Sequence, residues 1–188
     1  SNTGFVVLGK VIDIVTGQSY YDYVREHIFK PAGMDDTDSF ARDAARAKLA
    51  TGYARTFDEG GAPSFRSNTA MLGARGGPHG GGYSTATNLL KFSDALRSGK
   101  LLKRENVAIL LSAKPELGAT EYGYGFDVDE TRGTAGHGGG SHGISNNFEM
   151  FLDSGWTAIV LSNYTMLGIE ASAPVVQKIR ELVGDARP

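Results

Sequence analysis

The sequence contains no cysteine, which excludes disulfide bonds, thiolate zinc sites and a cysteine nucleophile. It also has no apolar run long enough to span a bilayer, and no signal-peptide pattern follows Ser1. A formal net charge of -2 gives no basic surface for nucleic acid or for an anionic membrane. What remains is a chain of 188 residues, long enough for one domain with a hydrophobic core.

Apolar residues at helical spacing predict several helices. The first ends at Gly17, and the second begins at a Ser19 cap and is ended by Pro31 and Gly33. Two more helices are expected within "STATNLLKFSDALRSGK" and "KRENVAILLSAK", and a last one follows a cap at Ser172. Between residues 35 and 82 no period is sustained, and only "ATGYART" and "GAPSFRS" read as short extended pieces.

From residue 122 onward the pattern changes to that of strands. Extended segments are expected in "YGYGFDV", "NNFEMFLD" and "WTAIVLSN", with a turn at 153–155 and Trp156 packed in the core beneath the hairpin. The order of elements predicts an α+β fold, with a helical region, antiparallel strands and a C-terminal helix.

Glycine is abundant, with 26 residues concentrated in 60–82 and 118–143, and the second concentration places His137 and His142 around a glycine run. On one strand, two residues five apart point to opposite faces, so these histidines do not form a ready metal pair. No acidic residue lies between them, and there is no His-Glu-x-x-His motif. A turn between them, together with His79, would be needed for a metal site.

Two other readings of the glycine runs are tested by what flanks them. Neither run ends in the Lys-Ser/Thr of a phosphate loop, although the glycines at 80–82 precede a helix and leave weak anion binding open. The stretch from Gly139 to Gly143 fits the Gly-x-Ser-x-Gly elbow of α/β-hydrolases, but a hairpin follows Ser141 and no histidine lies downstream of His142. The sequence therefore does not fit a nucleophile elbow. The hypothesis that the glycines form a purely structural turn stays open.

Three segments, taken together, resemble the serine β-lactamase and penicillin-binding-protein superfamily, in its class C-like and esterase-like branch. They are "SNTGFVVLGKVIDIVTGQSYYDYVREHIFKPAGMDDT", "GGGYSTATNLLKFSDAL" and "GHGGGSHGISNNFEMFLDSGWTAIVLSN". They are similar, in turn, to the stretch after a Tyr-x-Asn motif, a Gly-Gly-x-x-Ser-Thr helix entry, and a Lys/His-Thr/Ser-Gly strand with its hairpin. The resemblance runs over nearly the whole chain in the family's order.

The resemblance implies one partial, penicillin-recognising domain over residues 1–188. Within it, residues 1–33 are the helices after the Tyr-x-Asn position. Residues 34–118 are an excursion and a helical region, and residues 119–188 are an antiparallel sheet and the C-terminal helix. The fold is expected to be incomplete, because the family's N-terminal Ser-x-x-Lys part is absent.

The resemblance also assigns site residues, and it implies that Asn2, His137 and Gly140 are catalytic. Asn2 matches the asparagine of Tyr-x-Asn, and His137 takes the cationic position of the third motif, where Gly138 replaces a hydroxyl-bearing residue and removes one substrate hydrogen bond. Gly140 takes the position whose backbone N–H helps to form the oxyanion hole. The expected substrate-binding residues are Gly138, Gly139, Ser141 and Arg75, the last as a contact to a substrate carboxylate.

The family's nucleophile and base lie in Ser-x-x-Lys, where the helical i, i+3 spacing brings them together. No serine in this chain has lysine three residues later, and the tyrosine of Tyr-x-Asn would precede Ser1. The resemblance therefore implies the C-terminal part of a serine hydrolase that forms an acyl-enzyme with a β-lactam, a D-alanyl peptide or an ester. We expect it to be inactive alone, and no cofactor is implied.

Two further hypotheses stay open. One is a catalytically inactive, penicillin-recognising binding or regulatory module, and the other is a metal- or anion-binding domain built on the histidines. For the hydrolase, the expected partners are a small acyl substrate and either the missing N-terminal segment or a second copy, which would cover exposed apolar surface and sheet edges. No nucleic acid and no membrane span are expected in this chain, and the resemblance favours the periplasm or cell envelope.

Overall fold

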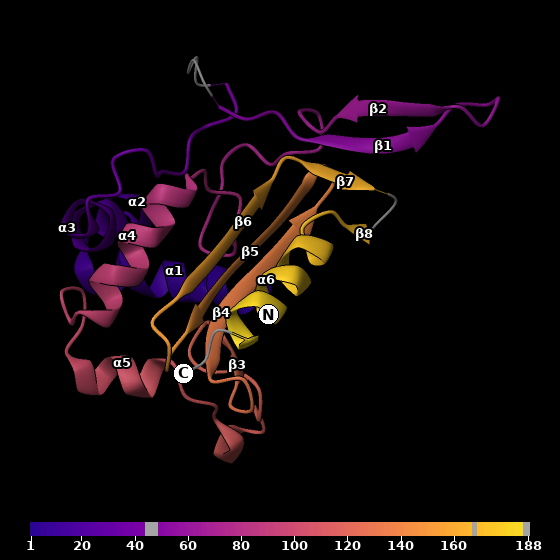
Figure 1. The fold of residues 1–188 in the computed structure, drawn as a ribbon. Coiled ribbons are helices and arrows are strands. Elements are labelled where there is room, and N and C mark those ends of the chain that lie inside the picture. The colour runs from indigo at the N-terminus through magenta and orange to yellow at the C-terminus, as the bar shows by residue number, and fades with distance from the viewer. Residues whose placement is uncertain (44–48, 167–168, 186–188) are drawn as a thin grey trace. The chain divides into compact units, whose positions relative to one another are not determined.

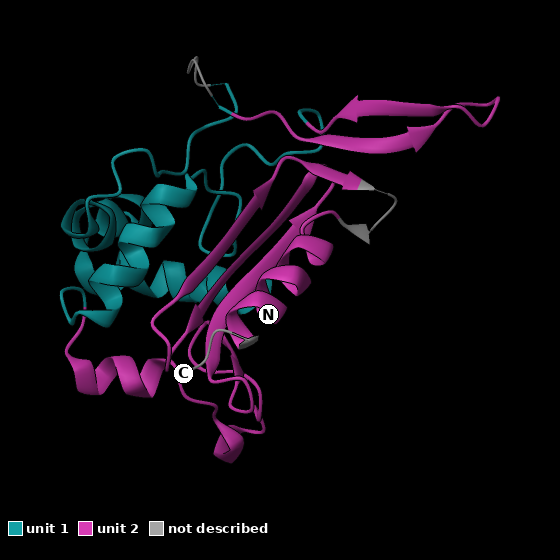
Figure 2. Cartoon of the chain, in the orientation of Figure 1, with its two compact units in different colours: residues 1–49, 69–101 teal, residues 50–68, 102–188 magenta. Residues whose placement is uncertain are grey.

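The computed structural model describes residues 1–43, 49–166 and 169–185. They form two compact units, of which unit 1 comprises residues 1–49 and 69–101 and unit 2 comprises residues 50–68 and 102–188 (Figure 2). Helices dominate unit 1, and unit 2 holds two sheets and further helices (Figure 1). The predicted α+β fold is confirmed, while the single-domain organisation stays a prediction.

Unit 1 begins with helix α1 (Asn2–Thr16), which ends at Gly17 in a left-handed conformation, as the sequence predicts. Helix α2 (Tyr20–Val24) follows, and the hydroxyl of its N-cap Ser19 accepts a hydrogen bond from the backbone N–H of Asp22 at 3.1 Å. The prediction that Gly33 ends this helical run is confirmed, because Gly33 is a left-handed C-cap, but the prediction that Pro31 also ends it is wrong. A π-helical turn at Arg25–Phe29 precedes α3 (Lys30–Ala32), and it widens the helix where the proline ring would otherwise meet a carbonyl.

The core of unit 1 lies where the third helix meets α4 (Ala86–Arg97). Ala32, Met34 and Ala95 are buried there, and the partly buried side chains packed against them are Phe29, Leu89, Phe92 and Leu101. The expected helix in this segment is confirmed, with a Thr85 cap at its start.

A tight hairpin turn in unit 1 accounts for the first glycine run. Gly77 and Gly80 exchange two backbone hydrogen bonds, of 2.8 and 3.0 Å, so Pro78 and His79 form a two-residue tip. A Cβ on Gly9 of α1 would overlap the ring of Pro78, so glycine allows the helix and the turn to approach closely. The glycines of this turn and Gly9 therefore allow the backbone to turn sharply and to pack closely.

Unit 2 is built on an antiparallel sheet in the order β3-β4-β5-β6 (Figure 1). Its strands are β3 (Asp127–Asp129), β4 (Thr134–Ser141), β5 (Ile144–Phe151) and β6 (Thr157–Ser162), and the C-terminal helix α6 (Ala173–Asp185) runs along one face. The expected turn after β5 is confirmed by Gly155, whose φ is 82°. The prediction that Trp156 packs in the core is wrong, because Trp156 is 60% exposed.

The second sheet has the order β2-β1-β7-β8. Strands β1 (Tyr53–Phe57) and β2 (Pro63–Ser67) form an antiparallel ribbon, as the two extended pieces predicted, and β7 (Tyr164–Met166) pairs with β8 (Ile169–Glu170). Strand β1 pairs with β7 in parallel, whereas the sequence predicted antiparallel strands only. Strand β7 is three residues long, which is too short to give a strand pattern in the sequence. Helix α5 (Arg104–Leu110) and a 3-10 turn at Pro115–Leu117 complete the unit. Across the described ranges, no helix has the length and apolar character to cross a bilayer.

Candidate active site

Strand β4 carries most of the predicted site residues, and its two halves differ in packing. Thr134 and Ala135 are buried, and β3 pairs with β4 only over residues 134–136. From His137 to Ser141, the outer edge of β4 has no strand partner among the described residues, and this half is largely exposed. The backbone groups on a free edge are available to an extended ligand.

The register assigns the residues of β4 to two faces. Gly136 lies opposite Glu149, and that row faces α6, because Arg180 of α6 donates to the Glu149 carboxylate at 2.9 Å. His137 lies opposite Phe148, so the alternation of a strand puts His137 and Gly139 on the face away from α6. His137 and Gly139 therefore lie on the same accessible face of the sheet.

Two of the glycines in the exposed half leave open space. A Cβ on Gly139 would meet no atom within 4 Å, and one on Gly138 would meet its nearest neighbour at 3.5 Å. Neither has the positive φ that would demand glycine. By contrast, a Cβ on Gly136 would overlap the carbonyl of Phe148. Packing therefore does not require glycine at positions 138 and 139. The missing side chains leave this part of the strand open to an incoming group.

His137 is held from two directions. Its Nδ1 is hydrogen-bonded to the carbonyl oxygen of Gly138, and its ring lies edge-on to the ring of Tyr122, with 6.1 Å between centroids. Burial, and then the nearby Asp127 carboxylate, raise the pKa of Tyr122 above its ordinary value. Tyr122 is therefore a neutral phenol at neutral pH, and it contacts His137 as an uncharged ring.

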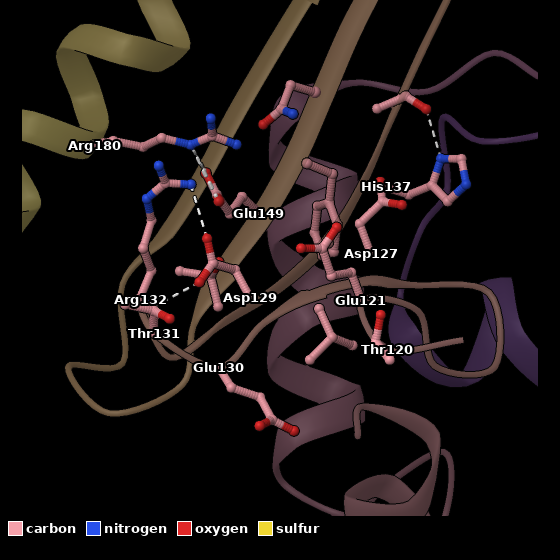
Figure 3. A pocket seen from close by; sticks show the side chains of 16 residues that line it. Thr120, Glu121, Asp127, Asp129, Glu130, Thr131, Arg132, His137, Glu149 and Arg180 are labelled. Atoms are coloured by element: carbon pink, nitrogen blue, oxygen red, sulfur yellow. Dashed lines mark hydrogen bonds and ion pairs between the residues drawn. The ribbon is translucent and has the colours of Figure 1, made fainter. Parts of the chain in front are cut away.

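A hollow of about 730 Å³ adjoins the buried half of β4, with His137 and Gly138 in its wall (Figure 3). Five carboxylates and two guanidinium groups line it. Arg132 pairs with Asp129 at 2.9 Å, and Arg180 pairs with Glu149 at the same distance. The other three carboxylates are Glu121, Asp127 and Glu130. The excess negative charge should favour a ligand with a neutral or cationic group on this side.

The remaining predicted residues lie in unit 1. Asn2 is the first residue of α1 and is exposed. The Nε of Arg75 donates to the Ser39 carbonyl at 2.7 Å, and its guanidinium carbon lies 3.5 Å from the ring centroid of Tyr21, so this side chain already supports the local fold. The roles of Asn2 and Arg75 in a site stay predictions. Over the described ranges, no group of three or more His, Cys, Asp or Glu is placed to hold a metal ion.

Sequence reasoning missed two kinds of residue around β4. Four of the five carboxylates of the hollow lie within residues 121–130, and the fifth, Glu149, comes from β5. Nothing in the local pattern of either segment indicated that they converge. Asn68, which is 2% exposed, donates to the carbonyl oxygen of His142, a residue 74 positions away. An asparagine close to Gly and Ser reads as a loop residue, so only the fold reveals this contact.

Comparison with known proteins places this geometry in a family. A family model described as Beta-lactamase matches residues 1–172. The chain belongs to the beta-lactamase family. Penicillin-binding protein 4 of Amycolatopsis lactamdurans is 27% identical over 98% of the chain and 51% of its own length. The chain thus spans about half of that relative, and the serine β-lactamase and penicillin-binding-protein resemblance is confirmed.

Solved structures agree with this placement. A penicillin-binding protein from Bacillus halodurans superposes with a TM-score of 0.81 and 27% identity, covering 97% of this chain and 55% of that one. A D-amino acid amidase from Ochrobactrum anthropi SV3, complexed with D-phenylalanine, gives a TM-score of 0.79 at 24% identity, covering 100% of this chain and 58% of that one. This second likeness is one of fold alone. The family is one of hydrolases.

Proposed function

We propose that strand β4 forms one wall of an acyl-transfer site in a serine hydrolase that acts on a β-lactam, a D-amino acid peptide or amide, or an ester. The observation that carries the proposal is the free outer edge of β4 beyond His137, where Gly138 and Gly139 leave room for an acyl group. Preorganised backbone N–H donors are among the strongest means of stabilising a developing oxyanion.

Each residue of this edge has a proposed part. The backbone N–H of Gly140 donates to the oxyanion that forms when a serine oxygen attacks the acyl carbon. His137 supplies a polar or cationic side chain beside the substrate, and Tyr122 supports its ring. Gly139 and Ser141 contact the acyl part, and Gly138 provides no hydroxyl hydrogen bond. In unit 1, Asn2 stays a proposed catalytic residue and Arg75 a proposed contact to a substrate carboxylate.

The serine and its base are proposed to come from outside these 188 residues, because no Ser-x-x-Lys occurs here. Two features support a covering partner, either an upstream segment of the same protein or a second copy. The outer edge of β6 has no strand partner among the described residues. In addition, six apolar side chains of α1 are exposed, namely Val6, Val7, Leu8, Val11, Ile14 and Val15.

The test is the intact mass of the protein after incubation with a fluorophosphonate or a penicillin, with and without the segment encoded upstream. Labelling only when that segment is present is the expected result. Labelling of the 188-residue chain alone would contradict the proposed origin of the nucleophile and would point first to Ser141. No labelling in either form would overturn the hydrolase and favour a penicillin-recognising module without catalysis.

A further inference from the structure

A buried asparagine joins the far end of β4 to the base of the β1–β2 ribbon within unit 2. The Oδ1 of Asn68 accepts from the backbone N–H of Gly52 at 3.2 Å, and its Nδ2 donates to the carbonyl of His142 at 3.0 Å. Its own backbone N–H donates to the Gly52 carbonyl at 2.9 Å. Asn68 therefore uses side chain and backbone together to tie the turn after Ser141 to a segment far away in the sequence.

The backbones at this junction are in close contact. A Cβ on Gly52 would overlap the Asn68 amide and lie 2.5 Å from the Gly143 carbonyl oxygen. Gly143 has a φ of 71°, and a Cβ there would lie 2.5 Å from the backbone nitrogen of Tyr53. The Gly143 N–H donates to the hydroxyl of Thr165 at 2.8 Å. This junction leaves the turn little freedom to shift.

Such an anchor matters because, among the described residues, the exposed half of β4 is paired on one side only, by β5. Side chains normally hold a strand by packing on its neighbours, but Gly138 and Gly139 have none. The near end is fixed by Thr134 and Ala135, which are buried and paired on both sides by β3 and β5. At the far end, β5 pairs with β4 as far as Ser141, and the His142–Gly143 turn beyond it is held by Asn68 and by the hydroxyl of Thr165.

We propose that Asn68 is a positioning residue that fixes the open edge of β4 through the His142–Gly143 turn. This inference rests on the proposed function for its catalytic consequence, since an oxyanion donor must be held in place before the reaction. Its structural consequence does not depend on that function. The two can therefore be tested separately.

The structural test is amide hydrogen exchange of the 188-residue chain with Asn68→Ala and Asn68→Asp. The aspartate keeps the acceptor for Gly52 but, when ionised, opposes the His142 carbonyl with a carboxylate instead of a donor. We expect the β4 amides bonded to β5, and the Gly143 amide, to exchange at least about tenfold faster, because the His142 carbonyl loses the donor that ties the turn to Asn68. The β5–β6 amides should change much less.

Two further arms keep the result specific. In Asn68→Asp, acidification below the pKa of the introduced carboxyl restores an O–H donor, and we expect protection relative to the unsubstituted protein at the same pH to return. The matched control is Asn88→Ala in unit 1, also 2% exposed, whose Oδ1 accepts from the backbone N–H of Asp36 and the hydroxyl of Thr37. Unchanged β4 exchange in both Asn68 variants, or equal loosening in the Asn88 control, would overturn the proposal.

The catalytic test uses the longer protein that includes the upstream segment. We expect Asn68→Asp to slow acylation by a penicillin about tenfold at neutral pH and to recover on acidification, relative to the parent at each pH. An undiminished acylation rate despite faster β4 exchange would overturn the catalytic part of the inference. If the unsubstituted longer protein is not acylated at all, the proposed function fails, while the exchange result still decides whether Asn68 positions the edge.

Discussion

Glycine is concentrated around residues 76–82 of unit 1 and 136–143 of unit 2, and Gly76 and Gly81 of the first region differ from Gly139 of the second. In the first, a Cβ on Gly76 would overlap the carbonyl of Gly81, and Gly81 itself has a φ of 81°. In the second, Gly139 has no neighbour within 4 Å and an ordinary backbone. Gly76 and Gly81 are therefore required by the local fold. At Gly139 glycine is dispensable for folding, so its presence leaves space for something else.

The largest expected effect separates these two regions directly. Gly76→Ala should lower the free energy of unfolding by about 1–3 kcal/mol, because the added methyl group meets backbone that cannot move cheaply. Gly139→Ala should change it by no more than about 0.5 kcal/mol. Urea unfolding of both variants measures this, and equal losses would contradict the contrast between the closely packed Gly76 and the open Gly139.

A second prediction concerns the anchoring of β4 on the face covered by α6. Glu149, opposite Gly136, is 4% exposed and paired with Arg180, so Glu149→Gln should cost about 1–2 kcal/mol by leaving a partly buried guanidinium without its charge partner. The control is Asp129→Asn, which breaks the more exposed pair with Arg132 and should cost less than about 0.5 kcal/mol. Equal costs in urea unfolding would show that α6 does not brace the strand.

The smallest expected effect is on the titration of Tyr122, at the border between the two halves of β4. Because its pKa is raised, the neutral phenol contributes stability that is present below the usual tyrosine value of about 10 and is lost as pH rises through the folded value. Asp127→Asn should lower the pKa of Tyr122 only in part, since burial is the larger cause. Ultraviolet difference titration against Tyr122→Phe measures it, and a complete return to the usual value would contradict the role of burial.

Local signals in the sequence predicted much of the fold. The Ser19 cap and the Gly17 C-cap depend on interactions between residues close in sequence. The β5–β6 hairpin has a recognisable turn sequence, so it too could be predicted from a short stretch of the chain. Pro31 misled because a π-helical turn upstream relieves the clash that a proline causes in a regular helix. Trp156 misled because a large apolar residue beside a hairpin is a core candidate only when a second layer covers it.

The candidate site was predictable only in part, for a similar reason. The glycine–histidine strand is one continuous motif, so the sequence could indicate His137 and its neighbours as a unit. The Tyr122 ring and the Asn68 amide reach the strand through tertiary contacts, across 15 and 74 positions. A single sequence carries no sign of which distant polar residue will meet which carbonyl.

In the proposed site, the open edge of β4 receives the acyl substrate. The most direct test is the acylation rate of the longer protein with Gly139→Val, a substitution that fits the strand backbone but fills the space beside His137. We predict unchanged stability and acylation by a penicillin that is at least about tenfold slower. An unchanged rate in a well-folded variant would mean that the substrate does not use this edge, and the proposed site would be wrong.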